Sequence, residues 1–124
     1  GRLDIRGADI LAINPQEDGL FVVECTTGPI EIGKISNLVC RTQSLVSMGY
    51  PANPVLFSTT GRETLADEVS KEAQNGNVSL ITKEGIQVLL SMAQRNAHPN
   101  EVSRFISQCI PNPKIPSYFR TMDR

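Results

Sequence analysis

Two acidic residues in neighbouring apolar segments, Asp9 and Glu24, are the residues of this sequence with the clearest potential for chemistry. A polar turn of four residues, PQED at 15–18, separates the two segments. If Asn14 and Gly19 flank this turn in an antiparallel hairpin, the numbers of facing residues sum to 33, so Asp9 faces Glu24. Facing side chains have Cβ atoms about 4.5–5.5 Å apart. The sequence therefore predicts a pair of carboxylates on an otherwise apolar face of a sheet.

Two facing carboxylates on such a sheet repel each other, and burial raises the cost further. A divalent cation, a basic side chain or a proton shared by the pair can offset this cost. Carboxylate oxygens suit Mg²⁺ or Mn²⁺, and Lys34, in the first turn of the helix expected next, supplies a nearby positive charge. An alternative stays open, in which Asp9 lies at a fraying strand end and Glu24 points into solvent or pairs with Lys34 or Arg6.

A mixed sheet with helices on its faces is expected to position these residues. The spacing of apolar, turn and capping residues predicts strands at 8–14, 20–26, 54–58 and 78–81, and helices at 34–48, 64–75, 83–95 and from 99 onward. The short turn makes the first two strands antiparallel, and each later strand–helix–strand connection predicts a parallel neighbour. The side chains of the helix at 83–95 that are expected to face inward are Ile86, Leu89, Leu90 and Ala93. The predicted fold class is α/β.

The stretches GADILAINP and GLFVVECTTGPIEIGKISNLV resemble the PD-(D/E)xK nuclease superfamily, whose members share the restriction-endonuclease-like fold. The resemblance covers most of the chain and implies a domain at 1–110, followed by a proline-rich tail or linker at 111–124. It implies that Asp9 and Glu24 bind a metal ion together with the backbone carbonyl of Cys25. Thr26 stands where the family has its lysine, and Lys34 looks like that lysine displaced to the following helix.

The activity implied by this resemblance is metal-assisted hydrolysis of phosphodiester bonds, with DNA rather than RNA as the preferred substrate and Mg²⁺ or Mn²⁺ as the cofactor. Lys34 would orient the attacking hydroxide and stabilise charge on the phosphate. Asn37 and Arg41 follow Lys34 by one and two helical turns and could contact a phosphate. The alternative function is a non-catalytic module that keeps the fold for oligomerisation or partner binding, and the missing lysine at position 26 favours it.

Further domains are expected around this one. The family's first helix, which should precede the first strand, is missing from the sequence, and an apolar run begins almost at once. We therefore expect this chain to be the cleavage domain of a larger protein. A homodimer is one way in which it could assemble. The C-terminal segment is a candidate nucleic-acid-contacting arm, with a solvated tail or a dimer arm as the alternatives; its basic and aromatic residues are Arg104, Lys114, Tyr118, Phe119, Arg120 and Arg124.

Composition excludes several other classes. The formal net charge of −1 gives no global attraction to nucleic acid or to anionic membranes, so any nucleic-acid binding must be local. No apolar run approaches the length of a membrane span, and neither G-x-G-x-x-G nor a complete P-loop motif is present. Three cysteines without metal spacing predict small buried side chains in a reducing, cytoplasmic compartment. The single histidine, His98, precedes Pro99 and is expected in a loop or as a helix cap.

Overall fold

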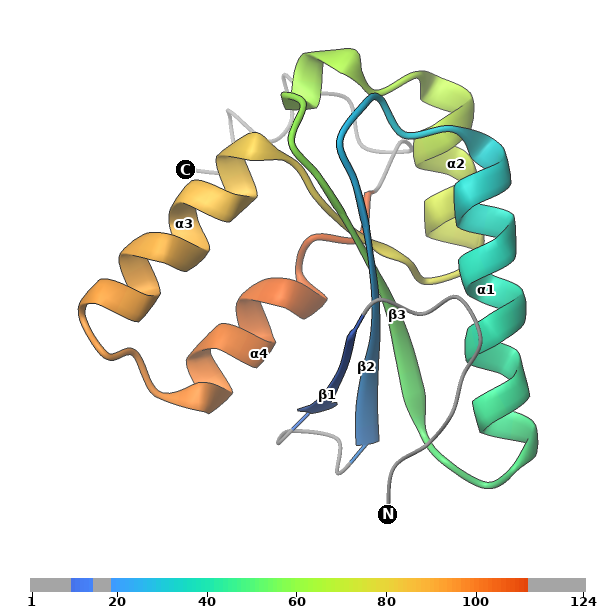
Figure 1. Ribbon diagram of the computed structural model, residues 1–124, viewed down its shortest axis with the longest axis horizontal. Helices are drawn as coiled ribbons and strands as arrows, with labels where there is room; N and C mark the ends of the chain where they lie inside the picture. Colours follow the sequence, from blue (N-terminus) through green and yellow to red (C-terminus); the bar gives the residue numbers. More distant parts are fainter. Residues whose placement is uncertain (1–9, 15–18, 112–124) are drawn as a thin grey trace, which may run out of the picture.

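The computed structural model describes residues 10–14 and 19–111 of the 124-residue chain. Its sheet has the order β1-β2-β3-β4 (Figure 1). The strands are β1 (Ile10–Asn14), β2 (Gly19–Thr26), β3 (Ala52–Ser58) and β4 (Ser79–Ile81). The helices are α1 (Ile32–Ser47), α2 (Asp67–Asn75), α3 (Lys83–Gln94) and α4 (Pro99–Ser107), with a 3₁₀ turn η1 (Arg62–Thr64) before α2. The described part of the chain is a mixed α/β domain.

The three strands β2, β3 and β4 are mutually parallel, as the strand–helix–strand connections predict. Glu24 of β2 aligns with Leu56 of β3, and Leu56 aligns with Leu80 of β4. Strand β1 pairs antiparallel with β2, and its register runs from Asn14↔Gly19 to Ile10↔Val23. Each of these β1–β2 pairs sums to 33, but residues 15–18, which carry the predicted turn, lie outside the described residues.

Helices cover both faces of the sheet (Figure 1). Alternation along β2 sends Val22 to the side of α1 and α2, and Phe21 and Val23 to the side of α3 and α4. Val22 packs with Ile35 and Leu38 of α1 in one cluster of buried side chains. The second cluster joins the other face of β2 to β3, β4, α3 and α4; its members include Phe21, Val23, Val55, Ile81 and Ile106. Side chains of β2 are therefore buried from both directions, as its unbroken apolar run predicts.

Two glycines and a histidine lie at the ends of helices or strands, and local geometry explains each of them. A Cβ atom at Gly19 would lie 2.6 Å from the carbonyl oxygen of Pro51, which accepts a hydrogen bond from the next residue of β2, so only glycine fits where β2 begins. Gly49, just after α1, has a φ of +94°, a conformation that glycine adopts without strain. His98 caps α4, because its Nδ1 accepts a hydrogen bond from the backbone N–H of Asn100 at 3.1 Å. The predicted capping role of His98 is confirmed.

The predicted helix at 64–75 is wrong at its start. Residues 62–64 form the 3₁₀ turn η1, Leu65 and Ala66 are extended, and α2 begins only at Asp67. The hydroxyl of Thr64 donates to the carbonyl oxygen of Gly61 at 2.7 Å, which stabilises the tight turn in place of a first α-helical turn. Asp67 and Glu68 then lie in the first turn of α2, where negative charge is favourable.

The inward face predicted for α3 is wrong in part. Met92 is the side chain of α3 that is buried, and Ile86 and Leu89 pack against the second cluster as expected. Leu90 is 59% exposed and Ala93 is exposed. These two residues of the predicted inward face are therefore not buried.

The predicted burial of the cysteines is also wrong. Cys25 and Cys40 are exposed and Cys109 is half-buried, and none of the three forms a disulfide. Among the described residues no helix combines the length and apolarity that crossing a membrane requires.

Candidate active site

Glu24 is a buried acid on the face of the sheet that α1 covers. It follows Val22 by two residues on β2, so the two side chains point to the same side, and Val22 belongs to the apolar cluster beneath α1. Only 8% of Glu24 is exposed. A carboxylate at such a place is stable only with strong compensation, since removing an ion from water is costly.

Two basic residues of α1 supply that compensation. Arg41 Nη1 donates a hydrogen bond to Glu24 Oε2 at 3.1 Å, and Lys34 Nζ lies 3.9 Å from Glu24 Oε1. Residues seven apart on a helix lie two turns apart on nearly the same face, about 10.5 Å along the axis. Lys34 and Arg41 therefore approach the carboxylate from two sides, and each of its oxygens faces one cation.

The predicted proximity of Lys34 to Glu24 is confirmed by this geometry. Arg41 was expected only as a phosphate contact, and its direct bond to Glu24 is not foreseen in the sequence. The signal that could have revealed it is the spacing of seven between Lys34 and Arg41, with the buried Leu38 between them on the same helix face. The three side chains together carry a net charge of +1.

The other predicted site residues are distributed as follows. Asp9 lies outside the described residues. Asn37 is exposed on α1. Thr26, at the end of β2, is half-buried and accepts a hydrogen bond from the backbone N–H of Gly28 at 3.5 Å. The Cys25 side chain lies on the opposite face of the sheet from Glu24, so its thiol is remote from the carboxylate.

Glu24 is chemically suited to be one ligand of a divalent metal ion. Its carboxylate oxygens are the hard donors that Mg²⁺ and Mn²⁺ prefer, and it stands at the end of the sheet where β2 gives way to a loop. Within the ranges 10–14 and 19–111, no three His, Cys, Asp or Glu side chains are grouped so that they could hold a metal ion.

Hydroxyl groups fix the loop that leads from β2 into α1. Ser58, fully buried at the end of β3, donates to the carbonyl oxygen of Gly28 at 2.9 Å and bonds to the hydroxyl of Thr60 at 2.7 Å. Thr59 donates to the carbonyl oxygen of Thr27 at 2.8 Å. These bonds tie the loop that carries α1 to the end of β3, so they hold Lys34 in place relative to Glu24. This role was not predicted; its signal in the sequence is the threonine pair at the end of both strands, in CTTG and STTG.

A carboxylate fixes the next loop in the same way. Glu84 in the first turn of α3 accepts hydrogen bonds from the backbone N–H of Arg62 at 2.9 Å and from the hydroxyl of Thr82 at 3.0 Å. These bonds, together with one from its own backbone N–H, hold the pKa of Glu84 below its usual value. The 3₁₀ turn after β3 is thereby joined to the start of α3.

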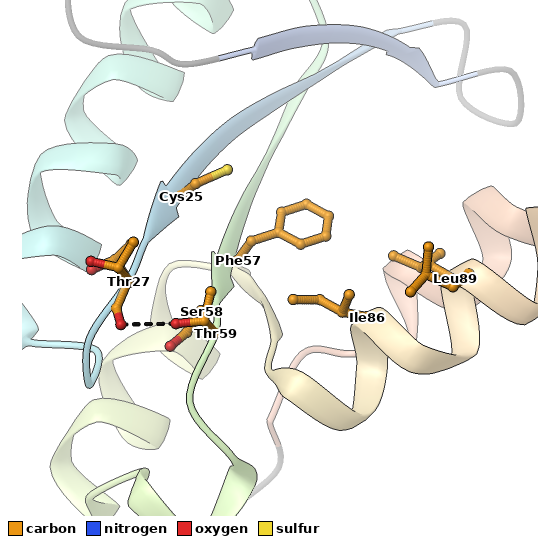
Figure 2. Close-up of a pocket in the computed structure, with 9 residues that line it drawn as sticks. Cys25, Thr27, Phe57, Ser58, Thr59, Ile86 and Leu89 are labelled. Carbon is orange, nitrogen blue, oxygen red and sulfur yellow. Dashed lines mark hydrogen bonds between the residues drawn. The ribbon is translucent and has the colours of Figure 1, made fainter.

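An apolar cavity of about 390 Å³ lies on the opposite face of the sheet, between β2, β3 and α3 (Figure 2). Figure 2 shows Phe57 of β3 pointing toward Ile86 and Leu89 of α3, with Cys25 beside it. The hydrogen bond between Thr59 and Thr27 closes one end (Figure 2). The cavity accounts for the exposure of Leu90, which belongs to its lining. Its apolar walls offer no acid or base for hydrolysis, so the candidate active site is the cluster of Glu24, Lys34 and Arg41.

Comparison of the chain with protein-family models, with curated proteins and with solved structures found no match.

Proposed function

We propose that this chain is a divalent-metal-dependent nuclease domain with a restriction-endonuclease-like fold, which hydrolyses phosphodiester bonds and prefers DNA to RNA. The observation that carries the proposal is the buried Glu24 carboxylate on a central strand, with Lys34 of the following helix 3.9 Å from one of its oxygens. An acid that is costly to bury and a lysine directed at it form an arrangement that phosphodiester hydrolysis can use. The same arrangement underlies the resemblance in the segment ECTTGPIEIGK.

Asp9 completes the proposed metal site. The β1–β2 register runs in steps of one residue to Ile10↔Val23, and the next step of the same ladder would bring Asp9 opposite Glu24. Facing residues of an antiparallel pair have Cβ atoms about 4.5–5.5 Å apart, a separation that one metal ion can bridge. We therefore assign Asp9 and Glu24 as ligands, with the carbonyl oxygen of Cys25 as a third.

Each residue then has a chemical role. A bound Mg²⁺ supplies Lewis acidity, which polarises the phosphoryl oxygen and lowers the pKa of a water molecule. Glu24 and Asp9 hold the cation at the end of the sheet. The side chain of Lys34 is 44% exposed and so reachable by substrate; in this proposal it orients the attacking hydroxide and stabilises the negative charge on the phosphoryl oxygens. The hydroxyl network around Ser58 keeps α1, and with it Lys34, in register with β2.

The test is DNA cleavage by the purified chain and by three variants. We expect wild-type protein to nick supercoiled plasmid with Mg²⁺ or Mn²⁺ and to be inactive in EDTA. Asp9→Asn and Glu24→Gln should abolish cleavage, and Lys34→Gln should lower the rate about 10²-fold or more, as is typical for loss of one transition-state contact. The matched control is Arg95→Gln, which breaks an exposed ion pair between Arg95, just after α3, and Glu101 of α4. Cleavage that persists in Glu24→Gln refutes the assignment.

A non-catalytic module for oligomerisation or partner binding is the second candidate. The observation that favours it is the hydrogen bond from Arg41, which occupies the Glu24 oxygen that Lys34 leaves free. Thr26 in place of the family's lysine points the same way. Calorimetric titration with Mn²⁺ separates the two functions, because a scaffold binds no metal at Glu24, whereas the nuclease loses its metal binding in Glu24→Gln.

A further inference from the structure

We propose that the apolar cavity between β2, β3 and α3 binds a small amphiphilic molecule, whose apolar part lies in the cavity while its polar end stays in solvent. Cys25, which lines the cavity, follows Glu24 directly on β2, so the two side chains point to opposite faces of the sheet. The proposal therefore depends neither on a metal ion nor on the nuclease function.

The size of the cavity fits a small molecule better than a protein partner. Its volume of about 390 Å³ lies within the range of about 300–1,000 Å³ that is typical of ligand sites. Nine residues line it, all of them in the described part of the chain. A stable protein–protein interface uses roughly 20–30 residues on each side, so this surface is too small for one by itself.

The walls determine which part of a ligand they would contact. Phe57, Ile86 and Leu89 meet across the cavity from β3 and α3 and are only half-buried (Figure 2). Leu90 also lines the cavity and is 59% exposed. An apolar ligand would remove the surface of these four side chains from water, which is favourable.

Polar groups at the cavity are bonded within the protein. The hydroxyl of Ser58 donates to the carbonyl oxygen of Gly28, and that of Thr59 donates to the carbonyl oxygen of Thr27. None of the described residues that line the cavity is charged, so an ionic group placed inside would lose its hydration without replacement. Cys25 and Thr27 are exposed, so the cavity opens to solvent beside the end of β2, where the polar end of the ligand would lie.

Dye binding tests the site with a matched pair of variants on α3. The probe is N-phenyl-1-naphthylamine, an apolar dye whose fluorescence rises when it leaves water, and decanoate is the amphiphile expected to displace it. Leu90→Asp places a charge on the wall and should weaken dye binding about tenfold or more. The control is Val88→Asp, since Val88 is 40% exposed on the same helix and does not line the cavity. Both positions are exposed, so both variants should keep a native circular dichroism spectrum.

The cysteines give a second readout that leaves the cavity walls unchanged. Cys25 lines the cavity, whereas Cys40 is exposed on α1 and serves as the control thiol in the same molecule. Each buried methylene group strengthens binding about fourfold. The ratio of the Cys25 rate to the Cys40 rate should therefore rise about tenfold or more from N-methylmaleimide to N-octylmaleimide, as peptide mass spectrometry can follow.

Three results would overturn the proposal. The first is wild-type protein that shows no saturable dye binding, or binding that Leu90→Asp and Val88→Asp weaken equally. The second is a ratio of the two cysteine rates that does not depend on the length of the alkyl chain. The third is a dimer in sedimentation velocity that Leu90→Asp converts to monomer while the dye fails to bind the dimer, which would assign the cavity to a second copy of the chain.

Discussion

Glu24 has two ion pairs of unequal geometry, and the difference between them can be measured. The Arg41 contact is a hydrogen bond of 3.1 Å with an arginine side chain that is 28% exposed. The Lys34 contact is 3.9 Å long, beyond hydrogen-bonding distance, with a lysine that is 44% exposed. The Glu24 side chain is 11% exposed in both pairs, so the difference lies in the basic partners.

The perturbation is a pair of double-mutant cycles, Glu24→Ala with Arg41→Ala and Glu24→Ala with Lys34→Ala. A hydrogen bond between charged groups contributes about 1.5–3 kcal/mol, and partial exposure of Arg41 places its coupling at the lower end, about 1.5–2 kcal/mol. An exposed ion pair without a hydrogen bond contributes about 0.2–1 kcal/mol, which is the range expected for Lys34. The cavity left by Glu24→Ala occurs in both cycles, so it does not affect their difference.

The assay is urea denaturation followed by circular dichroism in buffer with EDTA, so that bound metal cannot contribute. The coupling energy of the Arg41 cycle should exceed that of the Lys34 cycle by about 1 kcal/mol. Equal couplings, or a larger value for Lys34, would show that the observed contacts do not reflect how the carboxylate is stabilised. Arg95→Ala with Glu101→Ala is the exposed reference pair.

Three further predictions concern other parts of the domain. Burial raises the pKa of the Cys109 thiol, so an alkylating reagent near neutral pH should modify the exposed Cys25 and Cys40 before Cys109, as peptide mass spectrometry can follow. Because the pKa of Glu84 is lowered in the folded state, its contribution to stability is present above about pH 5 and is lost as the pH falls through the folded value; urea midpoints of wild type and Glu84→Gln should converge in acid. Gly19→Ala should destabilise the domain by about 1–3 kcal/mol, because its Cβ would meet the carbonyl oxygen of the residue before β3, whereas Gly33→Ala in α1, with open space around it, should be neutral or stabilising in the same thermal melts.

Strand positions and parallel pairing could be predicted from the sequence because they depend on strong, local patterns. Four consecutive apolar residues, 20–23, open β2, so burial on both faces follows directly from the sequence there. The helix after it has buried Ile35, Leu38 and Leu45 at the spacing of a single face, and Gly49 ends it. Once that helix packs on the sheet, a lysine in its first turn comes close to the last residues of β2. The approach of Lys34 to Glu24 was predictable for this reason.

The features that were missed depend on the orientation of helices relative to the sheet. Arg41 reaches Glu24 because α1 packs on the face of β2 that carries Glu24; the spacing of seven places Lys34 and Arg41 on one helix face but does not show that this face meets β2. Leu90 has an apolar side chain that suggests burial, yet α3 presents it to a surface cavity. Thr64 is a residue type that often stands at the start of a helix, but here its hydroxyl stabilises a 3₁₀ turn instead. For Arg41 and Leu90 tertiary packing decides the outcome, whereas at Thr64 a hydrogen bond within the turn outweighs a weak local preference.

The central claim is that Glu24 is a metal ligand, and anomalous diffraction from crystals soaked in Mn²⁺ tests it most directly. We predict an anomalous peak within coordination distance of a Glu24 carboxylate oxygen and of the Asp9 carboxylate. A peak elsewhere, or no peak beside Glu24, would contradict this claim.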